Sequence, residues 1–546
     1  MNMKKIINGL LAVGSLLLAV SCADYNETDN FTAAPDPTVT TPYKDLASVK
    51  SYINRDKYPN MSLGATLDLK TFNNQALEHA AAMTNFNDLY FGTSLMSGKI
   101  INSKGVMNYI DMKALVDHVD EIGGTVYGSA LAANSGQADN WLSLLTSPIE
   151  IYVEFQELLA VDFGKVESFS GKGGKIVKKD GQNVLQISAS TKCNVVEGFK
   201  VEPKAKYTTQ FWVKCDDVAT FTVYFSGTKV EGPLKGKYSI DGGGEWTRIA
   251  IEEQPAEGVE DGYVMIQTGR GSTLYVKKVQ IGYVPDNHRD QTPEEISDTI
   301  HWAMNAWCDG FMKNNAGRIK SFDLIEEPLG TKTLEGTDIL DLKHSSDKIY
   351  WQDIFGSEKY APVVSEDAIA GFKKYGGNAD DLKFFIAEKD LDNTQKFNSL
   401  MHWINVWTQN GAKIDGINAK VNLSYSEDAA TQAANESAFD KLLDNLKKSE
   451  MIIRLSNFDI TYQDAEGNNV VAKEITSEQR QKLADYYASL IKKYLAAIAP
   501  DKQAGICKAN IVDTNDPVGL WAVDAKTKDW VRTATYKAFC DAVSGQ

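Results

Sequence analysis

The chain has 546 residues and a formal net charge of −16 at pH 7. Because no basic run interrupts this acidity, the surface would repel nucleic acid and anionic membranes, and we exclude both as partners. Hydrophobic residues make up 43% of the sequence, which is enough for more than one buried core.

The N-terminus has the layout of a bacterial lipoprotein signal. Lys4 and Lys5 precede an uncharged apolar run over residues 6–20, and Ser21 and Cys22 follow it. The run is too short to span a bilayer well, and a small residue directly before a cysteine favours lipidation of that cysteine. We therefore expect a signal peptide over 1–21 and a lipid on Cys22.

The residues after Cys22 predict a flexible tether and a location at the cell surface. Residues 22–45 are rich in Thr, Pro, Asp and Asn, so they carry too little apolar surface to fold. Their acidic residues Asp24, Glu27 and Asp29 resemble the export tag of surface lipoproteins in Bacteroidetes, and they fit a solvated linker equally well. We expect a protein on the outer membrane, exposed at the cell surface.

Five cysteines remain after Cys22, and none has metal-ligand spacing. Cys193 and Cys215 could form a bridge in an oxidising compartment, although packed or free thiols are the favoured interpretation.

Short apolar strands alternate with helical patterns along most of the chain. The expected strands cover residues 63–67, 86–91, 124–131, 319–325, 382–387, 414–423, 451–460 and 505–512. The expected helices lie near 70–83, 111–122, 293–316, 364–375, 395–410, 428–448, 476–498 and 529–542. Eight strands alternating with eight helices predict a (β/α)8 TIM barrel, in which the C-terminal ends of the strands carry the chemistry.

One interval breaks this alternation. Between Gly164 and Tyr283 the pattern changes to short strands of period two separated by Gly-rich turns. This pattern predicts an inserted all-β jelly-roll sandwich over 162–285, between the third strand and third helix of the barrel. The barrel would then comprise 46–161 and 286–546.

The barrel resembles glycoside hydrolase family 10, the β-1,4-xylanases, and the sandwich resembles the carbohydrate-binding modules that interrupt such barrels in gut Bacteroidetes. The resemblance rests on the order and spacing of three segments. They are Tyr350 to Gly356 (YWQDIFG), Ser321 to Glu327 (SFDLIEE) and Ile414 to Ile417 (IDGI).

The resemblance implies a retaining mechanism with two glutamates, an acid/base after strand four and a nucleophile after strand seven. Glu327 matches the acid/base. Asn457, in the segment Ser456 to Asp459, stands at the nucleophile position. An amide is a poor nucleophile, so the resemblance implies a barrel that has lost half of its catalytic pair.

Residues that hold the sugar in the family are also replaced. The segment from Ser129 to Asn134 lacks the family's two histidines and its tryptophan. The other replacements are Thr93 and Met96 after strand two, Glu326 before the acid/base, Lys420 and Asn422 after strand six, and Ala509 at strand eight. Asp323, Asp415, Gly416 and Asp459 keep the family register and fit structural roles.

The leading hypothesis is a cell-surface lipoprotein that binds a plant-type β-glycan such as xylan and works beside glycan-uptake proteins. Trp212 lies among polar neighbours in an alternating strand and should face outward as a stacking platform, with a packing role about equally favoured. Trp246, after Gly242-Gly243-Gly244-Glu245, is a second candidate with a stronger tendency to be core. Glu326, Glu388, Lys420 and Asn422 are candidate sugar contacts in the barrel.

Two enzymatic alternatives remain. One is a glycosidase of altered mechanism that uses the substrate's own acetamido group, with Glu326, Glu327 and Glu388 near the cleft. Adjacent strand residues point to opposite faces, so Glu326 and Glu327 are not expected to act as a pair. The other is an ordinary endo-xylanase with a different nucleophile, for which Glu450 and Asp459 are badly placed. A purely structural surface protein would leave the insertion unexplained.

No cofactor or catalytic metal is expected. Related modules often hold structural calcium, but no acidic loop in this sequence has a diagnostic spacing.

Overall fold

The computed structural model describes residues 43–545, except 75, 122, 203–204, 272, 285–286 and 316. The expected signal peptide, Cys22 and nearly all of the tether lie outside the described residues. Within the part described, no helix combines the length and apolarity needed to cross a membrane. The chain divides into two compact units, residues 147–291 and the remainder.

The larger unit is a closed barrel of eight parallel strands, which confirms the predicted (β/α)8 fold. In chain order these strands are β1 (Ser62–Thr66), β2 (Asp88–Tyr90), β3 (Thr125–Gly128) with its extension β4 (Ala132–Ala133), β18 (Ser321–Glu326), β21 (Lys383–Lys389), β22 (Gly416–Lys420), β24 (Ile452–Ser456) and β26 (Gln503–Lys508). Parallel pairing runs through all of them, and β26 pairs with β1 to close the circle.

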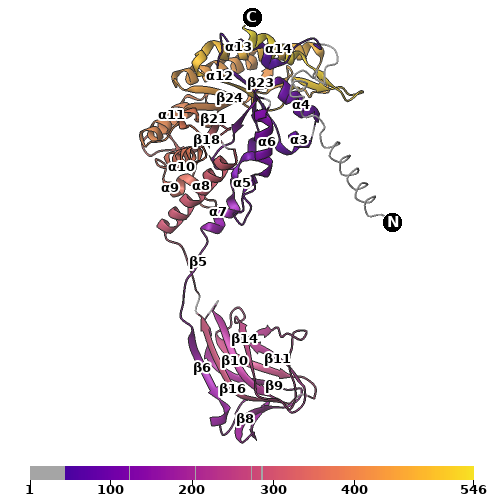
Figure 1. Cartoon of the computed structure of the whole chain (residues 1–546), viewed down its shortest axis with the longest axis vertical. Helices are drawn as coiled ribbons and strands as arrows, with labels where there is room; N and C mark the ends of the chain where they lie inside the picture. The colour runs from indigo at the N-terminus through magenta and orange to yellow at the C-terminus, as the bar shows by residue number, and fades with distance from the viewer. Residues whose placement is uncertain are drawn as a thin grey trace, which may run out of the picture. The chain divides into compact units, whose positions relative to one another are not determined.

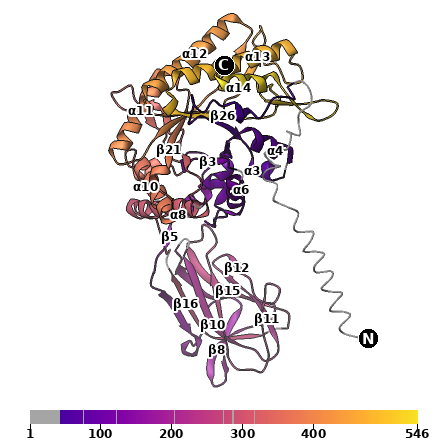
Figure 2. The same ribbon diagram turned by 45° about the horizontal axis from the view of Figure 1, so that its top comes forward.

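Helices surround the strands, as Figures 1 and 2 show. They are α3 (Leu69–Asn74) with α4 (Ala76–Asn85), α6 (Ile110–Glu121), α8 (Pro293–Asn315), α10 (Tyr360–Lys374), α11 (Thr394–Gln409), α12 (Ala429–Lys448), α13 (Ser477–Ala497) and α14 (Ala534–Ser544). Shorter helices α5 (Ser97–Ile100), α7 (Asp139–Leu145) and α9 (Trp351–Phe355) lie in the connections.

Helix α13 shows why these elements form. A capping box begins it, because the Thr476 side chain accepts from the Gln479 backbone and the Gln479 side chain accepts from that of Thr476. The predicted stripe of Leu483, Tyr487, Leu490 and Tyr494 is fully buried against the barrel. Burial of this one face stabilises the helix more than intrinsic propensity does.

The smaller unit is a sandwich of two antiparallel sheets around one apolar core. One sheet contains β14 (Thr247–Glu253), β10 (Lys206–Lys214), β16 (Leu274–Val284), β8 (Gln182–Ile187), β7 (Gly174–Lys179) and β6 (Gln156–Asp162). The other contains β12 (Thr228–Val230), β11 (Ala219–Phe225), β15 (Asp261–Thr268), β9 (Lys192–Lys200) and β13 (Tyr238–Ile240).

The limits of the insertion differ from those expected. The sequence places the sandwich over 162–285, whereas the compact unit spans 147–291 and includes β6, which pairs with β16. Most side chains of β6 are exposed rather than alternating between core and solvent. The period-two pattern that marks the other strands is therefore absent from this edge strand.

The sandwich cysteines are separate thiols. Cys193 and Cys215 are both free and buried, so the bridge considered for them is not formed. Burial raises the pKa of Cys193 to about 11, as expected for an unreactive packed thiol.

Candidate functional site

Glu326 and Glu327 lie at the C-terminal end of β18, at the mouth of the barrel. Glu327 has a left-handed backbone (φ +45°), so the chain leaves the extended conformation at this residue. Both carboxylates therefore reach one ammonium group: Lys420 Nζ is 2.7 Å from Oε1 of Glu326 and 2.7 Å from Oε1 of Glu327. The expectation that the two glutamates point to opposite faces is wrong, because alternation holds only within a regular strand.

Two further lysines surround the acid/base position. Lys389 Nζ lies 3.0 Å and Lys343 Nζ lies 3.7 Å from Oε2 of Glu327. These lysines come from the end of β21 and from the segment after β20 (Leu340–Leu342). Three ammonium groups thus face the carboxylates of Glu327 and Glu326, whose side chains are only 20% and 16% exposed.

This environment fixes the charge of Glu327. Burial alone would raise the pKa of its carboxyl, but hydrogen bonds from Lys420 and Lys389 outweigh burial and lower the pKa to about 2. For Lys420, burial acts to lower the pKa, yet the two carboxylates raise it well above its ordinary value. Both partners are therefore charged across the physiological range.

Asn457 directly follows β24, where the resemblance places the nucleophile. Its side chain is exposed and its backbone is left-handed (φ +56°), a conformation that asparagine tolerates better than most residues. The backbone carbonyl oxygen of Asn457 accepts a 2.7 Å hydrogen bond from the Asp459 backbone N–H. The amide has no ionisable oxygen for attack on a sugar carbon.

A buried polar network supports the barrel below the mouth. Tyr127 donates a 2.7 Å hydrogen bond to Asp323, and the Asn418 amide donates to both Asp323 oxygens at 3.0 and 3.1 Å. Burial raises the pKa of Asp323 to about 7. The structural role expected for Asp323 is confirmed.

Asp415, Gly416 and Asp459 also have structural roles. Asp415 accepts from the backbone N–H of Phe384, and a Cβ at Gly416 would lie 2.4 Å from the Phe385 ring. Asp459 forms an ion pair with Lys508, whose side chain is 1% exposed.

Three of the four predicted barrel contacts lie together, since Lys420 contacts both Glu326 and the cavity that Asn422 lines, and the fourth does not. Lys420 and Asn422 line a cavity of about 210 Å3 with Asp390, Asp392 and Tyr486. By contrast, Glu388 is completely buried. It accepts from the Leu329 backbone N–H and forms a 3.1 Å ion pair with Lys396 of α11, so the prediction that Glu388 meets a ligand is wrong.

The two candidate tryptophans of the sandwich are half-buried. Trp212 alternates with the fully buried Phe211 and Val213, which confirms that its side chain is on the outer face of its sheet. Trp246 precedes β14 and is half-buried rather than core. Their roles in binding stay predictions.

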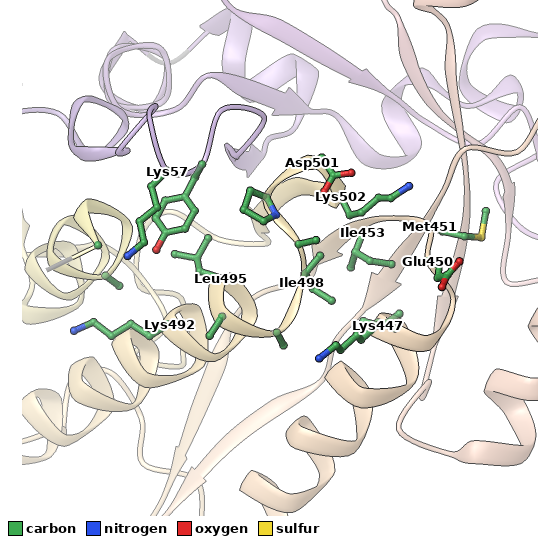
Figure 3. Close-up of a pocket in the computed structure, with 18 residues that line it drawn as sticks. Lys57, Lys447, Glu450, Met451, Ile453, Lys492, Leu495, Ile498, Asp501 and Lys502 are labelled. Atoms are coloured by element: carbon green, nitrogen blue, oxygen red, sulfur yellow. The ribbon is translucent and has the colours of Figure 1, made fainter.

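A hollow of about 950 Å3 lies elsewhere on the barrel, between the ends of α12, α13 and α14 (Figure 3). Figure 3 shows Lys447 and Lys492 beside the apolar side chains of Leu495 and Ile498. Met451 and Lys502 line it just before β24 and β26 begin, which is the opposite end of the barrel from Glu327. Barrel enzymes place their chemistry at the other end, so we assign this hollow no role in the site.

Sequence reasoning missed Lys343 and Lys389. Lys389 stands at the end of a barrel strand, where the fold places functional side chains, and could have been found by that position. Lys343 lies in a connection without a sequence signal.

Comparison with known proteins agrees with the barrel fold. Residues 271–522 match the sequence model of glycosyl hydrolase family 10, and this segment includes both Glu327 and Asn457. No curated protein matches the chain.

Solved xylanases share the fold. An endo-1,4-beta-xylanase of Penicillium canescens is 11% identical with a TM-score of 0.51, covering 91% of this chain and 98% of that one. An endoxylanase from a sugarcane soil metagenome is 10% identical (TM-score 0.51; 91% and 100% covered), and a xylanase of Cellvibrio japonicus is 12% identical (TM-score 0.50; 93% and 75% covered). At these identities the likeness concerns the fold alone. The chain therefore carries a (β/α)8 barrel like that of glycosyl hydrolase family 10.

Proposed function

We propose that this protein binds a xylan-type β-glycan at the cell surface without hydrolysing it. The observation that carries the proposal is the clamp of Lys420, Lys389 and Lys343 on Glu327. A glycosidase general acid must hold a proton near its working pH, and such carboxyls have raised pKa values. With its pKa lowered to about 2, Glu327 is ionised at neutral pH.

The replacement at the nucleophile position supports the same conclusion independently. Asn457 supplies no carboxylate to act as the nucleophile, and Glu327 is ionised and cannot act as the acid. Neither group of a retaining mechanism is therefore present in its working form. Substrate-assisted hydrolysis would dispense with the nucleophile but still needs a general acid, which Glu327 cannot supply while Lys420 holds it ionised.

The sandwich provides the remaining support. Trp212 presents an aromatic side chain on the outer face of a sheet, where the apolar face of a pyranose ring can pack on it. We propose that the N-terminal region, with a lipid on Cys22, fixes the protein to the outer membrane near glycan-uptake proteins.

Affinity electrophoresis in gels that contain soluble xylan, paired with a reducing-sugar assay, tests this function. We expect the protein to be retarded by the polysaccharide and to release no reducing ends. Trp212→Ala should lose most of the retardation. Its neighbour Phe211 supplies the matched control: Phe211→Leu changes the buried face of the same strand and should still bind. Hydrolysis that disappears in a Glu327→Gln variant would refute the proposal.

A further inference from the structure

The outer face of the six-stranded sheet in the sandwich groups cations around aromatic rings. Trp212 on β10 pairs directly with Arg248 of β14 on one side and with Lys278 of β16 on the other. Directly opposed residues of antiparallel strands project to the same face. Trp212 is thus flanked by two cationic side chains; Figure 1 labels the three strands.

A second lysine, Lys277, lies beside the second tryptophan, Trp246. The register between β10 and β16 shifts next to Trp212, and this shift leaves Lys277 outside the pairing. Lys277 Nζ lies 5.9 Å from the centre of the Trp246 ring, and Lys278 Nζ lies 5.4 Å from that of Trp212. Consecutive lysines therefore contact the two tryptophans.

Among the described residues, these three cations form no direct ion pairs. Arg248 donates from Nε and an Nη to the neutral Gln210 side chain, at 3.1 and 2.8 Å. In the part of the chain that the structure describes, neither Arg248, Lys277 nor Lys278 has a carboxylate within ion-pair distance. Asp162 stands opposite Lys278 in register; its carboxylate accepts a 3.0 Å hydrogen bond from the Gly164 backbone and forms no direct ion pair with Lys278. The lysines at the barrel mouth differ from these cations, because they already form ion pairs with Glu326 and Glu327.

The rows of the sheet next to Trp212 carry polar, charged and small side chains. The next row of the sheet consists of Gln210 and Gln280 flanked by the short side chains of Ala250 and Ala160. One row further, Gly282 pairs with Thr208, and Glu252 and Glu157 complete the row on either side, with the Glu157 carboxylate accepting a hydrogen bond from the Gln280 side chain. A Cβ at Gly282 would meet the half-exposed Phe155 ring at 2.0 Å. Phe155 therefore lies over the same face, about 14 Å along the strand from Trp212 at 3.4 Å per residue.

We infer that this face binds a glycan that carries carboxylate groups, such as a xylan with glucuronate substituents. Trp212 and Phe155 form two aromatic contacts for the chain of sugars, and Arg248, Lys277 and Lys278 pair with the carboxylates. Opposite charges on a binding surface and its ligand increase the preference for that ligand over others more than they increase the affinity itself. The inference rests on the proposed function and narrows its ligand.

The test compares two polymers by isothermal titration: glucuronate-bearing xylan, and the same xylan after chemical reduction of its carboxyl groups. We expect the intact protein to prefer the charged polymer by about threefold to tenfold at low salt, as for a few exposed ion pairs, and to lose this preference as salt increases. The Arg248→Gln/Lys278→Gln variant should bind both polymers equally.

Lys192→Gln/Lys237→Gln is the matched control, since it removes two exposed lysines associated with the other sheet and should keep the preference. Equal affinity of the intact protein for both polymers would overturn the inference and leave the proposed function standing. Retained preference in the Arg248/Lys278 variant would also overturn it. Binding of neither polymer would overturn the proposed function itself.

Discussion

Lys420 and Glu327 form a 2.7 Å ion pair at the mouth of the barrel. Lys420 is the last residue of β22 and Glu327 directly follows β18, so the pair joins the C-terminal ends of two barrel strands. The ion pair holds the Glu327 carboxylate in its ionised form.

Removing this lysine should release the carboxyl group. We expect Lys420→Gln to raise the pKa of Glu327 from about 2 toward its ordinary value, and to lower the free energy of unfolding at pH 7 by about 1–3 kcal/mol, because two neighbouring carboxylates lose their partner. Carboxyl NMR titration against a Glu327→Gln reference measures the pKa. Lys396→Gln, which breaks the ion pair of the nearby Glu388, should leave the Glu327 titration unchanged. An unchanged titration in Lys420→Gln would contradict the role of the clamp.

Restoring a carboxylate at position 457 should not restore hydrolysis. In Asn457→Glu, Lys420 would still hold Glu327 ionised, so under the proposed function reducing-sugar release should stay at background. Its left-handed backbone (φ +56°) also disfavours glutamate by about 1 kcal/mol. Asn457→Gly, which adopts this conformation freely, should leave stability within about 0.5 kcal/mol of the parent. Measurable xylan cleavage by Asn457→Glu would show that Glu327 can still be protonated.

Lys508 should be important for stability. Its buried ammonium donates to the carbonyls of Phe458 and Val518 and to the Tyr487 hydroxyl at 2.8–3.2 Å, and it pairs with Asp459 at 2.5 Å. Lys508→Met leaves these groups unpaired, so urea unfolding should show a loss of about 3–5 kcal/mol.

A surface lysine supplies the comparison for Lys508. Lys493→Met breaks only a partly exposed pair with Asp440 and should cost less than about 1 kcal/mol. Equal losses of unfolding free energy in the two variants would contradict the stabilising role of the Lys508 contacts.

Stability should decline with rising pH because of Asp323. Burial raises its folded pKa to about 7, from an ordinary value of 3.8. The stability contributed by the protonated carboxyl is therefore fully present below about pH 4 and is lost as the pH rises to about 7. Asp323→Asn cannot titrate, so its free energy of unfolding should vary less between pH 4 and 7.

Tyr127→Phe should keep the pH-dependent loss of stability that Asp323→Asn removes, and should change the pH at which it occurs. It removes a hydrogen bond that lowers the pKa of Asp323, and should therefore shift the transition to higher pH. Identical pH profiles for the parent and Asp323→Asn, measured by urea unfolding, would exclude Asp323 as the titrating group.

The sequence by itself determined the architecture of this protein. The stripes of α13 and the short apolar strands are local patterns, because helix and strand periods follow from backbone geometry, and all eight strands and helices were placed within a few residues. The presence of an amide rather than a carboxylate at position 457 is likewise a matter of one residue type at one position.

Only the tertiary structure decided what surrounds those positions. Lys389 and Lys420 reach Glu327 from the ends of two strands and Lys343 from a connection, and the left-handed turn at Glu327 reverses the direction that strand alternation implies. In the sandwich, the register of β14, β10 and β16 places Arg248 and Lys278 beside Trp212. Such contacts depend on pairing between distant segments, which no local period encodes, and the charge state of a carboxyl depends on those contacts.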